Sequence, residues 1–205
     1  PRFFFSYKLT DTWSANFNTG IYYQLPAYTV LGYAEDENNF INKANNITYI
    51  QSNHLVGGLE YRPSNYLRFT IEGFYKTYNN YPFSIRDSVS LANLGADFGV
   101  IGDEPVTSTS NGRSYGIEFL AQQKLNKNFY GILSLTYVVS EFEDKNGNYA
   151  ASSWDNRTII SLTAGKKFKH DWEAGLKWRF SGGLPYTPYD VEYSSLIYVW
   201  DINRQ

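Results

Sequence analysis

Residues that could perform acid–base or nucleophilic chemistry are few and lie far apart along the chain. The only histidines, His54 and His170, fall on separate predicted hairpins, and the chain contains no cysteine. No serine motif of the strand–turn–helix type places a nucleophile beside a base, and no paired carboxylates stand in a recognisable catalytic arrangement. A hydrolase built around His54 is an alternative with no nucleophile to support it. We therefore predict no catalytic residues and no enzymatic activity.

One short segment, Asp144-Lys145-Asn146-Gly147, resembles the start of a calcium-binding loop. The glutamate that would complete such a loop further along the chain is missing. Asn-Gly is a strong signal for a tight hairpin turn, so we predict a turn at this place. No metal site and no cofactor are expected.

Two long polar stretches, 24–51 and 80–113, carry aromatic side chains that could bind a ligand. Aromatic rings stack on sugars and on other ring-bearing molecules, and loops on a rigid scaffold commonly carry binding sites. The alternative is that these rings pack the loops against one another. The candidate ligand-binding residues are Tyr28, Tyr33, Phe40, Tyr81 and Phe98.

The elements that must position these residues are strands, because apolar and polar side chains alternate along most of the chain. The clearest unit covers residues 114–142, where two runs of about a dozen residues flank a polar turn. Leu133 and Leu135 there alternate with Ser134 and Thr136. The pattern predicts about eight strands in four hairpins: Arg2–Leu9 with Trp13–Tyr23, Ser52–Tyr61 with Tyr66–Tyr78, Ser114–Leu125 with Phe129–Phe142, and Trp154–Lys166 with Trp172–Ser181.

The connections between these strands alternate in length. Short turns close each hairpin, whereas long polar segments (24–51, 80–113, 143–153 and 182 onward) join one hairpin to the next. An up-and-down sheet places all short turns at one end and all long loops at the other, which is typical of outer-membrane barrels. Most strands also reach the roughly 9–11 residues that a tilted strand needs to cross a membrane core. We therefore predict an all-β fold, an antiparallel up-and-down transmembrane β-barrel.

Charged residues occupy the strand positions that alternate with the apolar ones. A basic side chain pointing at lipid costs about 2–4 kcal/mol at the bilayer midplane, so these residues are expected to face a hydrated lumen. Packing against material inside the barrel is favoured over a specific substrate path. The predicted lumen-facing residues are Arg68, Glu72, Glu118, Arg157, Lys177 and Arg179.

Aromatic residues, 19% of the chain, gather at two levels. Trp13, Tyr66, Phe129 and Trp172 each follow a short turn, as expected where an apolar band meets lipid headgroups. A second girdle is predicted toward the long loops, formed by Tyr22, Tyr23, Tyr75, Tyr78 and Tyr137.

Composition limits the remaining possibilities. The chain has 205 residues, enough for one domain, and a formal net charge of −2, which argues against a nucleic-acid-binding protein. The mean hydropathy is −0.44, and no run of about 18 apolar residues predicts a membrane-spanning helix.

Several segments, taken in order, resemble one family. They are WSANFNTGIYYQLP from Trp13, VGGLEYR from Val56, GRSYGIEF from Gly112 and WRFSGGLPYTPYD from Trp178. The chain resembles the C-terminal part of the barrel of TonB-dependent outer-membrane receptors, of the kind abundant in Bacteroidetes. In that family the complete barrel has about 22 strands and a plugged lumen. The resemblance implies that residues 1–205 form about eight strands of a larger barrel and that the plug domain is absent.

The resemblance also implies a function and partners. A receptor of this family lies in the outer membrane of a Gram-negative bacterium, in contact with its lipid. It imports a large, scarce nutrient, such as a ferric siderophore or a glycan, with energy from TonB-ExbB-ExbD, which would act through a part of the protein before residue 1. A surface lipoprotein is a possible further partner. The alternatives are a complete small eight-stranded outer-membrane barrel with a structural or adhesin role, and a soluble carbohydrate-binding sheet.

Overall fold

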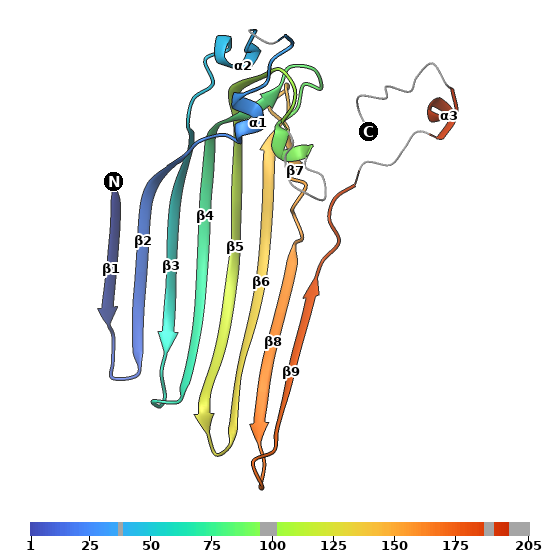
Figure 1. Ribbon diagram of the computed structural model, residues 1–205. Helices are drawn as coiled ribbons and strands as arrows, with labels where there is room; N and C mark the ends of the chain where they lie inside the picture. Colours follow the sequence, from blue (N-terminus) through green and yellow to red (C-terminus); the bar gives the residue numbers. More distant parts are fainter. Residues whose placement is uncertain (37–38, 95–101, 187–190, 197–205) are drawn as a thin grey trace.

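The computed structural model describes residues 1–36, 39–94, 102–186 and 191–196, and it consists almost entirely of one antiparallel sheet (Figure 1). The strands follow the chain in the order β1-β2-β3-β4-β5-β6-β8-β9, and the short β7 pairs with β6 outside this path. Their bounds are β1 Arg2–Lys8, β2 Trp13–Gln24, β3 Ile50–Tyr61, β4 Leu67–Ser84, β5 Val106–Asn126, β6 Phe129–Glu143, β7 Tyr149–Ala151, β8 Thr158–Lys167 and β9 Glu173–Ser181.

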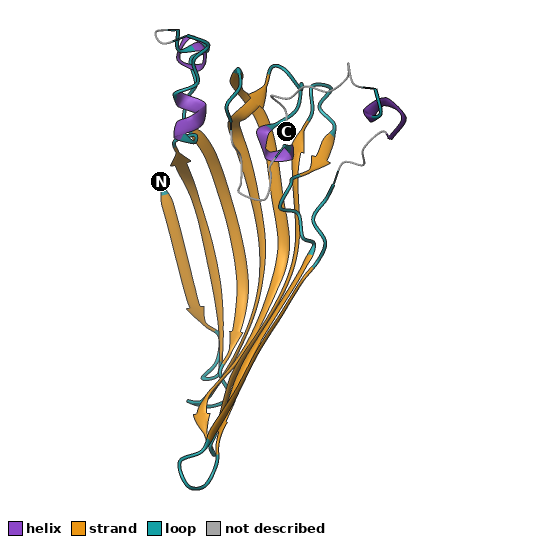
Figure 2. Cartoon of the chain, turned by 45° about the vertical axis from the view of Figure 1, so that its right-hand side comes forward, coloured by secondary structure: helices purple, strands orange, loops and turns teal. Residues whose placement is uncertain are grey.

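The predicted all-β, up-and-down architecture is confirmed, and so are the eight long strands. Figure 2 shows a curved sheet with short turns at one end and longer connections at the other; these are called the short-turn end and the long-loop end. The sheet is open: within the described residues, β1 pairs only with β2 and β9 only with β8. The alternative of eight strands closed on themselves is therefore wrong.

Four short helical segments accompany the strands. They are α1 Tyr28–Leu31, α2 Ile41–Ala44, the 3-10 turn η1 Leu91–Asn93 and α3 Val191–Ser194. No helix among the described residues is long and apolar enough to cross a membrane.

The central strands are longer than the sequence pattern predicts. β4 continues to Ser84 and β5 begins at Val106, so the predicted loop 80–113 contains strand at both ends. The segment from Val106 is rich in threonine, whose branched Cβ favours the extended backbone although its hydroxyl is polar. Two register shifts lie on either side of Tyr81. The first inserts one residue in β4, where Asn80 takes φ 59°, and the second inserts one residue in β5.

The strand register separates two faces along the whole sheet. One, the apolar face, carries Phe17, Leu55, Leu59, Ile71, Ile117 and Leu135. The other, the polar face, carries Asn16, Glu60, Glu72, Glu118 and Thr136.

The apolar face is left exposed, unlike that of a water-soluble sheet. Leu55 and Ile117 on the apolar face are 49% and 47% exposed, whereas Glu60 on the polar face is only 9% exposed. A soluble fold would cover so large an apolar surface with a second layer. The described residues supply none, so the apolar face must meet an apolar medium.

The one cluster of buried apolar side chains in the described residues lies at the long-loop end. Val30, Leu91 and Val106 form it, and Ile47 and Tyr81 pack against it. These residues come from three segments distant in sequence, so this small core joins the connections to one another and to β4 and β5.

Candidate functional site

A hollow of about 580 Å³ lies at the long-loop end, and most of the strand residues that line it belong to the polar face. β2, β3, β4 and the loop before β8 each contribute to its wall. The residues with ring side chains are Tyr22, Tyr23, His54, Tyr78, Tyr81 and Trp154. Of the described residues that were predicted to bind a ligand, Tyr81 alone lies in this wall.

The rings in and behind this wall contact one another. The centroids of Tyr22 and His54 are 4.4 Å apart, and the Arg2 guanidinium carbon lies 4.5 Å from the Tyr22 ring centre. On the other side, Phe142 packs 5.5 Å from Tyr78 and supports it from behind. Such a wall offers flat apolar faces together with hydroxyl and imidazole groups, which suits a ligand that carries rings or sugars.

Hydrogen bonds and edge contacts fix several of these rings. His54 Nε2 lies 2.8 Å from Ser52 Oγ, and the Phe142 centroid lies 4.8 Å from that of Tyr81 and 6.4 Å from that of Trp154. Since Phe142 is 1% exposed, the wall rests on a packed layer. The hollow is therefore held in shape before a ligand arrives.

The predicted second aromatic girdle is partly wrong, because it assigned two residues of this wall to the outer surface of the barrel. Tyr75 and Tyr137 lie on the apolar face, whereas Tyr22 and Tyr78 share the polar face with His54. Strand alternation alone contained the signal, because Tyr22 is two residues from Gly20 and Tyr78 is two from Lys76. Grouping tyrosines by height along the strand ignored this alternation.

Two carboxylates stand side by side at mid-height on the polar face. Glu72 on β4 is directly opposite Glu118 on β5, and the Glu72 side chain lies over Gly58 of β3. Neither carboxylate has an ion pair or hydrogen bond with a described residue. Like charges directly opposite each other on adjacent strands repel. A cation between the two carboxylates would relieve this repulsion, and the described sheet does not provide one.

A contrasting, satisfied cluster occupies the short-turn end. The Glu60 carboxylate accepts from Arg62 Nε at 2.5 Å and from Arg68 Nε at 2.7 Å. Both arginines line a hollow of about 610 Å³, together with Lys124 and Asp11. Arg68, predicted to face the lumen, is thus on the polar face and paired within the sheet.

The remaining predicted charges lie apart from this cluster. Lys177 and Arg179 on β9 are opposite Thr163 and Ser161 of β8, on the polar face at the edge of the sheet. The strand position predicted for Arg157 is wrong, because β8 begins only at Thr158. Arg157 precedes it at φ 58° and pairs with the buried Asp155 at 3.0 Å.

The predicted loop aromatics do not form one site. Tyr28 on α1 is 85% exposed, and Tyr33 after α1 is partly buried. Phe40, exposed before α2, borders a separate hollow of about 420 Å³ with Leu31 and other residues of the same loop. Phe98 lies outside the described residues.

The connections at the long-loop end are bonded into one layer. Asn42, fully buried, donates from Nδ2 to the Val30 carbonyl at 2.7 Å and to the Glu104 carbonyl at 2.9 Å. Its Oδ1 accepts from the Val106 N–H at 2.8 Å. Asn45 Nδ2 donates to the Val106 carbonyl at 2.9 Å and the Thr48 N–H to Ser108 Oγ at 3.0 Å, so three residues tie the loop 25–49 to the start of β5.

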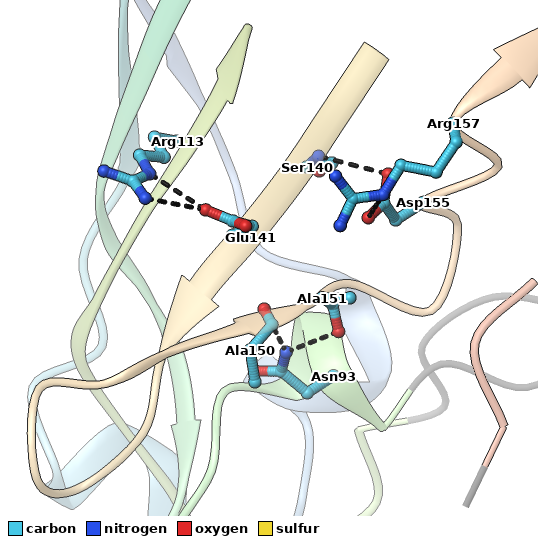
Figure 3. A network of polar contacts seen from close by, with 8 residues as sticks. All are labelled: Asn93, Arg113, Ser140, Glu141, Ala150, Ala151, Asp155 and Arg157. Atoms are coloured by element: carbon cyan, nitrogen blue, oxygen red, sulfur yellow. Dashed lines mark hydrogen bonds and ion pairs between the residues drawn. The ribbon is translucent and has the colours of Figure 1, made fainter.

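A second set of bonds joins η1 to β7, and β6 to the loop before β8 (Figure 3). Asn93 Nδ2 donates to the carbonyls of Ala150 and Ala151 at 3.1 and 2.9 Å, and Asp155 Oδ1 accepts from the Ser140 N–H at 3.3 Å. These contacts hold the wall residue Trp154 between two fixed segments.

The calcium-like segment is a hairpin turn, as predicted. Asp144 Oδ1 accepts from the N–H groups of Asn148 and Asn146 at 2.9 and 2.8 Å, and Gly147 takes φ 77°. The bond from Asn148, with the smaller one from Asn146, holds the pKa of Asp144 below its ordinary value. Over the described ranges, no three His, Cys, Asp or Glu side chains group in a way that could hold a metal ion.

Solved structures with a similar fold include receptors and a transporter. FpvA of Pseudomonas aeruginosa, solved with heterologous pyoverdines, is 17% identical with a TM-score of 0.63 over 89% of this chain. The ferric-catecholate import receptor Fiu of Escherichia coli K12 is 15% identical with a TM-score of 0.65, also over 89%. The copper transporter OprC is 19% identical with a TM-score of 0.60 over 87%.

The chain spans only 22%, 24% and 25% of the lengths of these three proteins, so it corresponds to a part of their barrels. None of the curated proteins with which the sequence was compared matches it. The family model described as "TonB dependent receptor-like, beta-barrel" matches residues 1–203. Open edges, an exposed apolar face and this match over nearly the whole chain lead to one conclusion: the protein belongs to the TonB-dependent receptor β-barrel family of the Gram-negative outer membrane.

Proposed function

We propose that the chain is part of an outer-membrane receptor that imports a large, scarce nutrient, such as a ferric siderophore or a glycan, with energy coupling through TonB. The observation that carries this proposal is the aromatic hollow at the long-loop end of the polar face. Its rings are held by packing and its mouth lies beside the connections, where a ligand arriving from outside the cell would first meet the barrel. The proposal includes no catalytic step.

The orientation follows from the same proposal. The polar face lines the lumen, the long-loop end is extracellular and the short-turn end is periplasmic. TonB-ExbB-ExbD would act on parts of the receptor outside these residues, because the chain spans about a quarter of comparable receptors.

The unpaired carboxylates supply a specific expectation about those parts. A plug domain that fills the lumen would place basic side chains against Glu72 and Glu118 and so remove their mutual repulsion. At the short-turn end, Arg62, Arg68 and Lys124 outnumber the buried Glu60 carboxylate. This cluster would instead receive an acidic or polar part of the plug. Lumen charges would then position the plug rather than select the cargo.

A surface lipoprotein is a further partner that the loops could accommodate. α1 and α2 lie at the long-loop end (Figure 1), where Tyr28 and Phe40 are exposed and Phe40 borders a hollow lined by residues of the same loop. Exposed aromatic side chains of this kind are frequent at protein interfaces.

The test uses the full-length receptor in a deletion strain that depends on it for growth. Candidate iron and glycan sources are first screened for growth that requires the receptor. Replacement of Tyr78 and Trp154 by Ala is then expected to weaken binding of the active nutrient at least tenfold, because each ring provides about 1 kcal/mol of contact. Tyr137→Ala, on the apolar face, is the matched control. Unchanged binding by the double variant would contradict the assignment of the hollow.

A further inference from the structure

Two neighbouring rows of the polar face meet at the aromatic hollow. The upper row, nearer the long loops, runs from β2 to β6 through Tyr22, Ser52, Tyr78, Gly112 and Phe142. The lower row, one step toward the short-turn end, runs through Gly20, His54, Lys76, Ser114 and Ser140. His54 lines the hollow together with three residues of the upper row, so the lower row continues the floor of the hollow.

Lys76 is the cation of the lower row, and its neighbours in the sheet carry no negative charge. On the adjacent strands it stands opposite His54 and Ser114. Along β4, the nearest residues on the same face are Phe74 and Tyr78. The diagonal neighbours on this face are also neutral: Ser52, Val56, Gly112 and Gly116. Lys76 forms no ion pair with any described residue.

The surroundings of Lys76 make an unpaired charge costly. Its side chain is only partly exposed, and Nζ lies 5.1 Å from the centre of the Phe74 ring. A ring face attracts a cation but does not neutralise it, so an anion that reaches this place would be bound favourably. Arg2 stands at the same height on β1, opposite Gly20, and its only described partner is the Tyr22 ring.

The carboxylates around the hollow are already bonded. Asp155, next to the wall residue Trp154, pairs with Arg157 at 3.0 Å and accepts from the Ser140 N–H. Glu104, buried in the loop layer, accepts from the Ser84 hydroxyl and lies 3.8 Å from Arg86. None of the described residues that line the hollow is acidic.

The nearest unpaired carboxylate of β4 is out of reach. Glu72 stands two rows below Lys76, which is about 13 Å along the strand. The short-turn end shows the contrast, because there Arg62 and Arg68 both hold the Glu60 carboxylate. The sheet thus pairs its cations internally at that end and leaves a cation free beneath the hollow.

Rings above and a free cation below suit one kind of ligand. The aromatic side chains offer flat faces to a ring, and Lys76 offers a charge-assisted hydrogen bond to an acidic group carried beside that ring. A neutral sugar chain would contact the rings only and would leave the cation unpaired.

We propose that the hollow selects a nutrient that carries negative charge beside its rings, and that Lys76 is the residue that recognises this charge. The inference rests on the proposed function and narrows it. A ferric chelate with acidic groups or an acidic glycan fits the hollow, whereas a neutral glycan does not.

The experiment measures binding of two matched probe pairs to the full-length receptor by isothermal titration calorimetry. The first pair is a negatively charged ferric tris-catecholate and a neutral ferric tris-hydroxamate. The second is an oligogalacturonate and a neutral galacto-oligosaccharide of the same length. An acidic probe should bind about tenfold or more tightly than its neutral partner, and the pair that responds identifies the source of the charge.

Substitutions of Lys76 then test the residue itself. Lys76→Gln should weaken binding of the acidic probe about tenfold or more, because one charge-assisted hydrogen bond is lost, and should leave binding of a neutral probe unchanged. Lys76→Arg keeps the charge and should restore most of the affinity. Lys177→Gln makes the same change on the polar face at the edge strand β9, away from the hollow, and serves as the matched control.

Three results would overturn the proposal. They are binding of a neutral probe as tight as that of its acidic partner, binding of neither acidic probe, and unchanged binding of the acidic probe by Lys76→Gln. If that last variant instead lowers the thermal stability of the receptor, Lys76 is a contact of the plug. The hollow is tested separately: weaker binding of a neutral probe by Tyr78→Ala with Trp154→Ala would keep the hollow as a binding site while removing its charge selection.

Discussion

The sheet and the layer of loops above it bury their apolar side chains in opposite ways. In the loop layer, Val30, Leu91 and Val106 lie inside together with the buried polar residues Asn42 and Glu104, as in a soluble protein. In the sheet, Leu55, Ile71 and Ile117 point outward and are exposed, whereas charged residues gather on the other face. The two regions are continuous in the chain but are built for different solvents.

The comparison shows where polar groups are satisfied and where they are left for a partner. Each bond-forming group of Asn42 in the loop layer has a partner within the chain. Glu72 and Glu118 in the sheet have none among the described residues. Most buried polar groups of the loop layer are bonded within the chain, and Asn93 Oδ1, Ser152 Oγ and Asn156 Oδ1 are the exceptions among the described residues. The polar face of the sheet is instead prepared for something placed against it.

The largest expected effect comes from reversing the solvent preference of one strand position. Leu135→Arg places a cation on the apolar face near mid-height, at a cost of about 2–4 kcal/mol, and should block assembly in the outer membrane. Thr136→Arg, one residue further, points to the polar face opposite Glu118 and should assemble normally. The measurement is the amount of heat-modifiable folded receptor in outer-membrane fractions. Equal assembly of both variants would contradict the assignment of the faces.

In the loop layer, Asn42→Ala should loosen the attachment of the loop 25–49 to β5, which Asn45 and Thr48 also hold, without unfolding the barrel. It leaves the Val106 N–H and two carbonyls without their partner, at a cost of about 1–3 kcal/mol. Limited proteolysis of intact cells should cleave this loop faster, while the barrel remains resistant to heat in detergent. Asn39→Ala, at an exposed position of the same loop, serves as the control. A loss of barrel stability by Asn42→Ala would mean that the two regions are not separable.

Glycines on the two faces provide a finer comparison. Gly112→Ala forces a methyl group into the Phe142 ring, and such overpacking typically costs about 1–3 kcal/mol. Gly73→Ala meets only open space and should leave stability unchanged or raise it slightly. Thermal unfolding of the two variants in detergent is the measurement. The assignment of crowded and open faces fails if Gly73→Ala proves the more damaging change.

The smallest expected effect is a change in stability when one carboxylate of the Glu72–Glu118 pair is neutralised. Whether the change stabilises or destabilises the receptor is informative. Glu72→Gln removes a like-charge repulsion of about 0.2–1 kcal/mol, so it should stabilise a barrel whose lumen holds only water. If a plug supplies cations, the same change should instead weaken retention of the plug. Thermal unfolding of the full-length receptor distinguishes the two results, and the proposed plug contact predicts destabilisation.

Much of this architecture could be predicted because strand alternation is a local property. The hairpin turn at 126–128 and the apolar face through Leu133 and Leu135 follow from neighbouring residues alone. The extra lengths of β4 and β5 were missed because Thr107 and Thr109 are polar but extended. Arg157 was misplaced because a positive φ interrupts the strand before Thr158.

The candidate site was harder to predict than the fold. Its wall combines Tyr22, Tyr78 and Trp154, which are far apart in the sequence, and the register of β2, β3 and β4 brings the two tyrosines together. The opposition of Glu72 and Glu118 likewise depends on the pairing of β4 with β5, which the sequence does not specify residue by residue. Buried Asn42 carried no sequence signal, because an asparagine in a polar loop is ordinary.

The central claim is that the apolar face meets lipid while the polar face meets an enclosed interior. The chain contains no cysteine, so a spin label attached to Leu135→Cys or Thr136→Cys is unique within these residues. In the full-length receptor in membranes, the label at 135 should collide readily with oxygen, which concentrates in lipid, and rarely with a water-soluble nickel chelate. The label at 136 should show little oxygen collision. Equal oxygen collision at both positions, or the reverse order, would contradict the account.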